Sequence, residues 1–431
     1  MAKNANNKVS IWQSLHNAWK VQDIRKKLIY TFFMLILFRL VGVIPAPGVD
    51  YVRVKSAMSG SNLPLLDLVN MMTGSNFSNM TIMAMGITPY INSSIIMQLL
   101  TIAIPALERL SKSGPDGQKK IASITRYVTV VLAVIQAIGL VYSLGYIKSG
   151  WFNTVLVGVS MAAGTALAMW IGERITANGL GNGVSLLIFA GIISNLFNGF
   201  TSLIANAFSA TSLTPWLTLL AVLLFALVMI VVVTFVDMGV RRIQVQYAKR
   251  VTGRKMYGGQ SSILPLKVCS VGVMPLIFAY SFMAFPSTLI QLFGGSESGL
   301  GHWWSRYMSY YSPLYMIVTA LLIIAFTYFY TSISFQPDEM AKNIQQQGGV
   351  IPHVRPGKPT ADFLARTNNR LTLFAALFLA VLATLPNLFT VGLQTSVPFA
   401  ASSLLIAVSV VLETKRQLDD LLVSRNYDTL T

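Results

Sequence analysis

The feature that most constrains this chain of 431 residues is a series of continuous apolar runs, each near the roughly 20 residues that cross a bilayer core as one helix. A helix satisfies its own backbone hydrogen bonds, which lipid cannot do. The alternating segments of about ten residues that build a membrane β-barrel are not seen. The sequence therefore predicts an all-α integral membrane protein.

Ten membrane-spanning helices are expected, several of them interrupted by glycine or proline. Breaks fall at Gly86 and Pro89 and at Gly272 and Pro275, and such breaks are tolerated where neighbouring helices or a cavity satisfy the backbone. The expected spans cover residues 28–45, 80–104, 121–145, 153–172, 183–205, 215–236, 268–292, 313–335, 371–389 and 397–413.

Ten spans divide into two sets of five, and an odd number makes two homologous halves face opposite ways in the membrane. Inverted repeats of this kind commonly build a transport path at their interface. We expect an N-terminal half at residues 1–206, comprising the tail and the first five spans. A C-terminal half at residues 207–431 would hold the other five spans and two cytoplasmic loops, at about 237–267 and 336–370. No convincing sequence repeat supports this division, so it depends on the count alone.

The charge distribution predicts the orientation. Only 11% of residues are charged, against about 25% in soluble domains, yet the formal net charge is +17. With the N-terminus inside, most lysines and arginines fall on the cytoplasmic side, so both termini are expected in the cytoplasm. The basic first 27 residues show no signal-peptide pattern and are expected to be a retained tail. The two basic loops are expected either to touch anionic lipid or to dock RNA or an acidic protein.

The sequence contains no cluster of residues typical of a catalytic or metal site. The three histidines are scattered, the single Cys269 excludes an internal disulfide, and no metal or nucleotide motif occurs. We therefore expect no enzyme activity, cofactor or metal. Arg39 is the clear ionisable residue within a span and is interpreted as a structural arginine bonded to carbonyls. The alternative is an inverted-repeat secondary transporter of a small solute, which the absence of a mid-span carboxylate disfavours. A membrane-embedded enzyme comes third, since no catalytic cluster lies within the spans.

Five segments, in order along the chain, resemble the SecY family of protein-conducting channels. They are MGITPYINSSIIMQLL (85–100), GERITANGLGNGVSLLIFAGI (172–192), RRIQVQYAKR (241–250), LPLKVCSVGVMPLIFA (264–279) and IPHVRPGKPTADFL (351–364). The resemblance implies ten helices around a central pore in the bacterial plasma membrane. It implies transport of unfolded proteins with a signal sequence, lateral release of hydrophobic segments into the membrane, and a drive from the SecA ATPase or the ribosome.

The resemblance also implies a ring of aliphatic side chains that closes the pore. Pairs four residues apart share one helix face, and such a ring excludes ions by dewetting without gripping one peptide. The ring positions are Ile87, Ile91, Ile188, Ile192, Ile277 and Ile406. An apolar segment at about residues 62–73 corresponds to a plug, although by itself it also fits a helix lying on the membrane surface. Its apolar residues are Leu65, Leu66, Leu68 and Val69.

Two further sets of residues follow from the same resemblance. A lateral gate between the second and seventh spans would use Asn92, Ser93, Gln98 and Ser270. Docking of SecA, or of ribosomal RNA during insertion, would use Arg241, Arg242, Lys249, Arg250, Arg254, Lys255, Arg355 and Lys358. Small membrane subunits similar to SecE and SecG, and anionic lipid, complete the expected partners.

Overall fold

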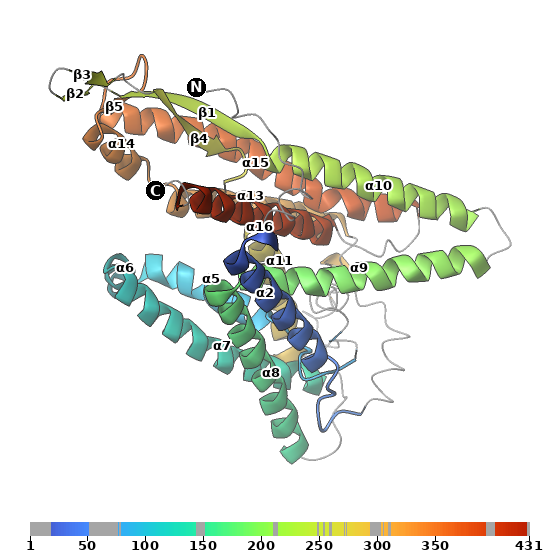
Figure 1. Ribbon diagram of the computed structural model, residues 1–431. Helices are drawn as coiled ribbons and strands as arrows, with labels where there is room; N and C mark the ends of the chain where they lie inside the picture. The colour runs from blue at the N-terminus through green and yellow to red at the C-terminus, as the bar shows by residue number, and fades with distance from the viewer. Residues whose placement is uncertain are drawn as a thin grey trace. The chain divides into compact units, whose positions relative to one another are not determined.

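The ten predicted spans each correspond to one long helix of the computed structural model (Figure 1). The structure describes residues 19–50, 76, 79–143, 151–209, 214–247, 250–252, 255–257, 261–270, 272, 274–293, 303–304, 306–308, 312–393 and 401–428. The ten helices are α2 (Gln22–Val41), α5 (Thr88–Ala103), α7 (Pro115–Ser143), α8 (Trp151–Asn178), α9 (Gly183–Ser209), α10 (Thr214–Asp237), α11 (Met274–Phe293), α13 (Pro313–Ser334), α15 (Lys358–Leu393) and α16 (Ala401–Asp428).

The second span departs from its expected form at both ends. Helix α5 begins at Thr88, because the chain turns sharply before it and Gly86 adopts a positive φ of 53°. After α5, Pro105 starts the short helix α6 (Pro105–Lys112) at 101° to it. Of the described helices, six are long and apolar enough to cross a membrane, or seven if this bent pair counts as one span.

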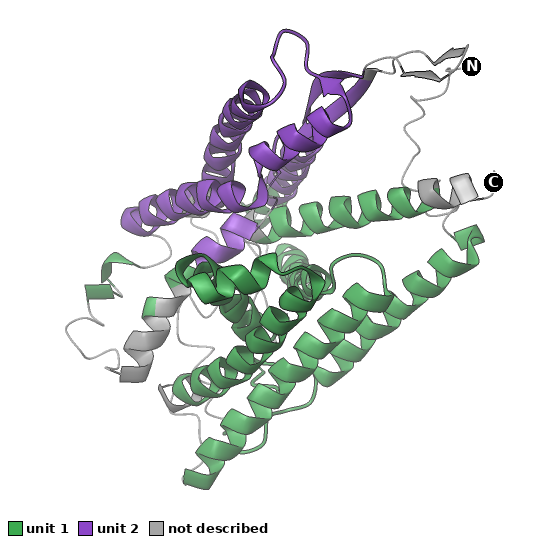
Figure 2. Cartoon of the chain, turned by 90° about the vertical axis from the view of Figure 1, so that its left-hand side faces the viewer, with its two compact units in different colours: residues 1–219, 281–310, 396–431 green, residues 220–280, 311–395 purple. Residues whose placement is uncertain are grey.

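Two compact units divide the described chain, and Figure 2 colours them separately. Unit 1 comprises Met1–Leu219, Ser281–Tyr310 and Ser396–Thr431. Within it, α7 packs along α8, and α9 packs against α16. A glycine of α8 permits the close packing on α7: a β-carbon added at Gly158 would lie 2.5 Å from Ile138 Cγ1.

Ends of α2, α8, α9 and α16 in unit 1 are joined by an apolar cluster. Helix α16 continues to Asp428, well past the expected end of its span at residue 413, because its later turns pack on other elements. Ile24 of α2 and Leu180, from the turn between α8 and α9, meet Leu418 of α16 in the buried centre of the cluster.

Unit 2 comprises Leu220–Tyr280 and Tyr311–Thr395. The two loops expected in the cytoplasm contain strands that the apolar runs did not predict. A three-stranded antiparallel sheet has the order β4-β1-β5, from β4 (Ser261–Lys267), β1 (Val240–Tyr247) and β5 (Gly349–Val350). Strands β2 (Arg250–Thr252) and β3 (Lys255–Tyr257) form a separate pair within the loop between β1 and β4.

One core joins the two loops of unit 2, both expected on the cytoplasmic side, into a single folded body. It is called the cytoplasmic module below and comprises β1, β4, β5, the helix α14 (Pro337–Gln346) and the start of α15. Figure 1 shows the sheet lying along α14 and α15. The buried side chains that form this core are Ile243, Val245, Leu266, Ile344, Ile351 and Leu364. The loops expected at residues 237–267 and 336–370 are thus parts of one folded body.

The membrane part of unit 2 is built on α13 and α15. Thr319, Ile323 and Thr327 are four residues apart on α13, so they share one buried face. The hydroxyl of Thr327 donates to the carbonyl of Ile323, 2.6 Å away, which satisfies a polar group within the helix itself. Small residues of α15, such as Ala376, are fully buried. Two helices with such faces can approach closely in lipid.

Candidate functional site

The glycine-rich turn between α8 and α9 sets where α9 begins. The side-chain oxygen of Asn182 accepts the backbone N–H of Val184 at 3.1 Å, which caps the helix. The N–H of Gly183 donates to the hydroxyl of Thr176 at 2.9 Å. Gly181 adopts φ +86°, a conformation that favours glycine. These bonds make the segment a tight connection between two helices.

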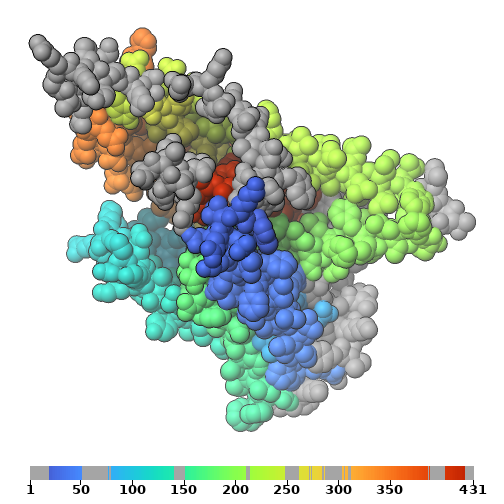
Figure 3. All heavy atoms as spheres, in the orientation of Figure 1, coloured from blue at the N-terminus to red at the C-terminus, as the bar shows by residue number. Residues whose placement is uncertain are grey.

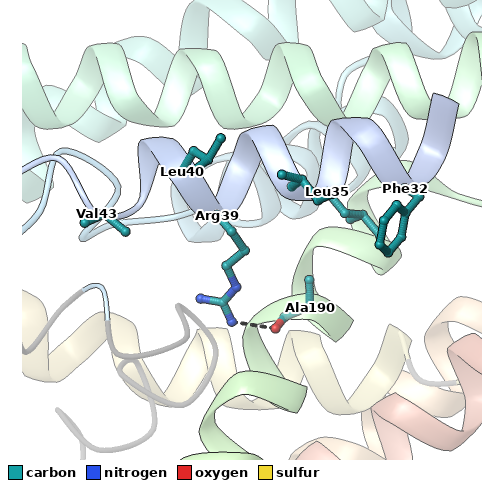
Figure 4. Close-up of a pocket in the computed structure, with 7 residues that line it drawn as sticks. Phe32, Leu35, Arg39, Leu40, Val43 and Ala190 are labelled. Atoms are coloured by element: carbon teal, nitrogen blue, oxygen red, sulfur yellow. Dashed lines mark hydrogen bonds between the residues drawn. The ribbon is translucent and has the colours of Figure 1, made fainter. Parts of the chain in front are cut away.

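Helix α2 holds the same region at two points. The hydroxyl of Thr31 accepts the backbone N–H of Leu180 at 2.9 Å, within the turn. Two helical turns further on, Arg39 Nη2 donates to the carbonyl oxygen of Ala190 in α9 at 2.6 Å (Figure 4). A charged side chain in the hydrocarbon layer is costly unless a polar partner meets it. The interpretation of Arg39 as an arginine bonded to a carbonyl is confirmed.

The six expected ring residues are all buried. In unit 1, Ile87 is the N-cap residue of α5 and Ile91 follows one turn later, while Ile188 and Ile192 lie on α9 and are 2% and 1% exposed. Gly172 of α8 faces Ile87, since a β-carbon there would lie 3.6 Å from Ile87 Cδ1.

Ile406 is buried on α16, also in unit 1, and Ile277 is buried on α11 in unit 2. All six side chains are therefore buried, five of them on unit 1 and one on unit 2. The plug residues Leu65, Leu66, Leu68 and Val69 lie outside the described residues.

Polar residues expected at the lateral gate form hydrogen bonds within their own helix or turn. Ser93 is buried in α5 and its hydroxyl donates to the carbonyl of Pro89 at 2.8 Å. Gln98 Nε2 donates to the hydroxyl of Ser94 at 3.3 Å, and Asn92 is half-buried on the same helix. Ser270 lies in the turn before α11, which begins later than the expected residue 268, and donates to Lys267 O at 2.8 Å.

The expected docking residues fall on the cytoplasmic module and the loop within it. Arg241 and Arg242 are exposed on β1, and Arg355 and Lys358 are exposed before and at the start of α15. The carbonyl of Arg355 accepts the hydroxyl of Thr360 at 2.8 Å, which fixes the backbone beside it. Arg250 and Lys255 lie in strands β2 and β3, and Lys249 and Arg254 lie outside the described residues.

An ion pair between α7 and α8 is one feature that the sequence analysis missed. Arg126 Nε lies 2.8 Å from Glu173 Oε1, and both side chains are partly exposed. Glu173 belongs to the GERIT segment, so a carboxylate one residue after Gly172 was visible, but its partner 47 residues away was not. Among the described residues there is no group of three or more potential metal ligands.

The family comparison defines the class of this protein. The family model described as SecY matches residues 81–415, which include all six ring positions. Relatives named "Protein translocase subunit SecY" include that of Streptomyces scabiei, 41% identical over 95% of this chain and 98% of the relative. That of Corynebacterium glutamicum is 39% identical over 96% and 98% of the two chains.

Solved structures agree in fold. One described as a protein-conducting channel has a TM-score of 0.69 and 20% identity, with 92% of each chain covered. Canine Sec61, from a ribosome–channel complex of the endoplasmic reticulum, has a TM-score of 0.64 and 18% identity, again over 92% of each chain. The fold is therefore that of a ten-helix protein-conducting channel of the membrane. More narrowly, the chain belongs to the SecY family, whose members are channel subunits of the protein translocase.

Proposed function

We propose that unfolded secretory proteins pass this channel through a constriction formed by Ile87, Ile91, Ile188, Ile192, Ile277 and Ile406. The observation that carries the proposal is that the family match contains every one of these positions and that each side chain is buried. Aliphatic side chains at a narrow waist exclude hydrated ions and still yield to any peptide.

The finer parts of the mechanism follow from this constriction. The apolar segment at 62–73 seals the pore from outside as a plug. The polar face of α5 with Asn92, Ser93 and Gln98, together with Ser270 before α11, borders an opening to lipid through which apolar segments leave, because only they partition favourably into hydrocarbon. The halves 1–206 and 207–431 move against each other when this gate opens.

The partners are assigned by charge and by the absence of an energy source in the sequence. The chain has no nucleotide motif, so a motor or the ribosome supplies the work. SecA or ribosomal RNA docks on the basic surface around Arg242, Arg355 and Lys358. Subunits similar to SecE and SecG and anionic lipid surround the helices, and both termini lie in the cytoplasm of a bacterial cell.

Disulfide crosslinking tests the constriction. A secretory protein with one cysteine is arrested halfway through a channel that carries Cys269→Ser and Ile188→Cys. An adduct is expected, because the substrate must pass this side chain. The matched control is Ile193→Cys, since Ile193 is exposed on another face of α9 and no adduct is expected there. Equal yields at the two positions, or no adduct at Ile188, Ile91 and Ile277, would reject the constriction.

A further inference from the structure

Helix α2 presents one face with a cation at its centre. Phe32, Leu35, Leu40 and Val43 line an open apolar pocket of about 350 Å³ together with Arg39 and Ala190 (Figure 4). In the space-filling view, α2, in blue, lies at the surface of the side shown (Figure 3). A guanidinium among apolar side chains needs an acceptor, and α9 supplies the carbonyl of Ala190 at 2.6 Å.

The position of that carbonyl relative to the isoleucines is the key observation. Ala190 lies two residues after Ile188 and two before Ile192. Successive residues of a helix are rotated by about 100°, so Ala190 is roughly 160° around α9 from each of them. Arg39 therefore contacts the back of the helix turn whose front carries the two isoleucines, both of which are buried.

A second hydrogen bond joins α2 to the region around the start of α9. Thr31 and Arg39 are eight residues apart, which places them about 80° apart around α2, on the same side of the helix. Thr31 accepts the N–H of Leu180 just before α9 begins, and Arg39 donates to Ala190 seven residues after its first residue, Gly183. One hydrogen bond alone leaves a helix free to rotate about it, whereas two bonds ten residues apart fix both its rotation and its depth.

We propose that Arg39 is a positioning residue for the channel constriction: by holding the Ala190 carbonyl, it keeps Ile188 and Ile192 directed at the pore. This inference depends on the proposed constriction. The chemistry favours arginine, because its planar fork of five N–H donors reaches a backbone carbonyl while it stays charged. A small residue at position 190 leaves room for the guanidinium beside the helix backbone.

The test uses Arg39→Met, which keeps the length and apolar stem but removes every donor. In vesicles, ion leak per folded channel is expected to rise severalfold. In a Cys269→Ser, Ile188→Cys background, labelling of the cysteine by a water-soluble thiol reagent is expected to rise by a similar factor. Arg39→Lys keeps the cation and one donor group. Its leak and labelling are expected to lie between those of the wild type and those of Arg39→Met. The matched control is Arg109→Met, which removes an exposed arginine of α6 and is expected to change neither quantity.

The outcomes separate this inference from the constriction itself. Leak in Ile188→Asn with Ile192→Asn, but unchanged leak and labelling in folded Arg39→Met, overturns the positioning role and leaves the constriction standing. Leak in Arg39→Met without leak in the asparagine variant rejects the constriction. A loss of folded protein with normal leak per channel means that Arg39 serves stability alone. If Arg39→Met does not fold, wild-type labelling in Arg39→Lys overturns the proposal.

Discussion

Gly172 of α8 and Gly183, the first residue of α9, differ in how much space each leaves for a side chain. A β-carbon added at Gly183 would lie 1.9 Å from the carbonyl oxygen of Gly172, a distance that real β-carbons do not reach. At Gly172 the nearest atom to an added β-carbon would be Leu187 Cδ1 at 3.4 Å, an ordinary contact. Only Gly183 must therefore be glycine for reasons of space.

The substitution Gly183→Ala is expected to destabilise the channel by about 1–3 kcal/mol, because the backbone of α8 must shift to admit the methyl group. Thermal unfolding of the purified protein measures this loss. The matched control is Gly172→Ala in α8, which is expected to leave the midpoint close to that of the wild type. Equal losses from both substitutions would show that the close approach does not govern stability.

At the scale of residues, the sequence predicted which kind of group a side chain would bind, but not which residue supplies it. Arg39 was expected to meet a carbonyl because a cation in lipid has few other choices. The carbonyl itself, 151 residues away in α9, is determined by packing that no local pattern encodes. For the same reason Thr31, an ordinary threonine in an apolar run, gave no signal that its hydroxyl would accept the N–H of Leu180.

Among the elements, those of the cytoplasmic module were not predicted, although the sequence patterns of β1 and α14 indicate a strand and a helix. Strand β1 alternates polar and apolar residues from Arg242 to Tyr247, which is typical of a half-buried strand. Helix α14 begins with Pro337 and two acidic residues, a usual start signal. What the sequence could not supply was the pairing of Gln246 with Val350, because contacts between distant loops have no local pattern.

Leu364 tests whether the two loops are one body. It is fully buried in the module core, so Leu364→Ala is expected to cost about 2–5 kcal/mol of stability. Limited proteolysis of inverted membrane vesicles should then cut both loops faster, since β1 and β5 lose the same support.

The matched control for this experiment is the neighbouring Phe363→Ala, because Phe363 is partly exposed and lies outside the core. It is expected to leave cleavage near the wild-type rate. Faster cleavage of the 336–370 loop alone in Leu364→Ala would contradict the shared core.

For the whole molecule, charge and hydropathy predicted the number of spans and the class of fold. They could not predict which segments pack into one unit. Residues 396–431 belong to unit 1 with the first 219 residues, since Leu418 of α16 packs on Ile24 and Leu180. Hydropathy identifies the apolar segments, but it does not show which of them pack against one another.

The proposed docking of SecA involves the surface around Arg355, so a change at this residue tests it. Arg355→Glu is expected to abolish most SecA-dependent export, because it places a negative charge on the surface proposed to meet the motor. Export of a secretory protein into vesicles measures the effect, with insertion of the channel checked separately. The control Lys120→Glu makes the same charge change at an exposed position of α7, and normal export is expected. Normal export by Arg355→Glu would remove this residue from the docking surface.

Helix α15 joins the two environments of unit 2 in one continuous element. Its 36 residues correspond to about 54 Å of helix at 1.5 Å per residue. Leu364 near its start is buried in the cytoplasmic module, whereas Leu379 and Leu382 are buried further along the same helix, which packs on α13. Pro386, where the rod can bend, comes only after these residues. A force applied to the module would therefore act on one continuous helix, which would carry the displacement along its axis to the apolar part of unit 2.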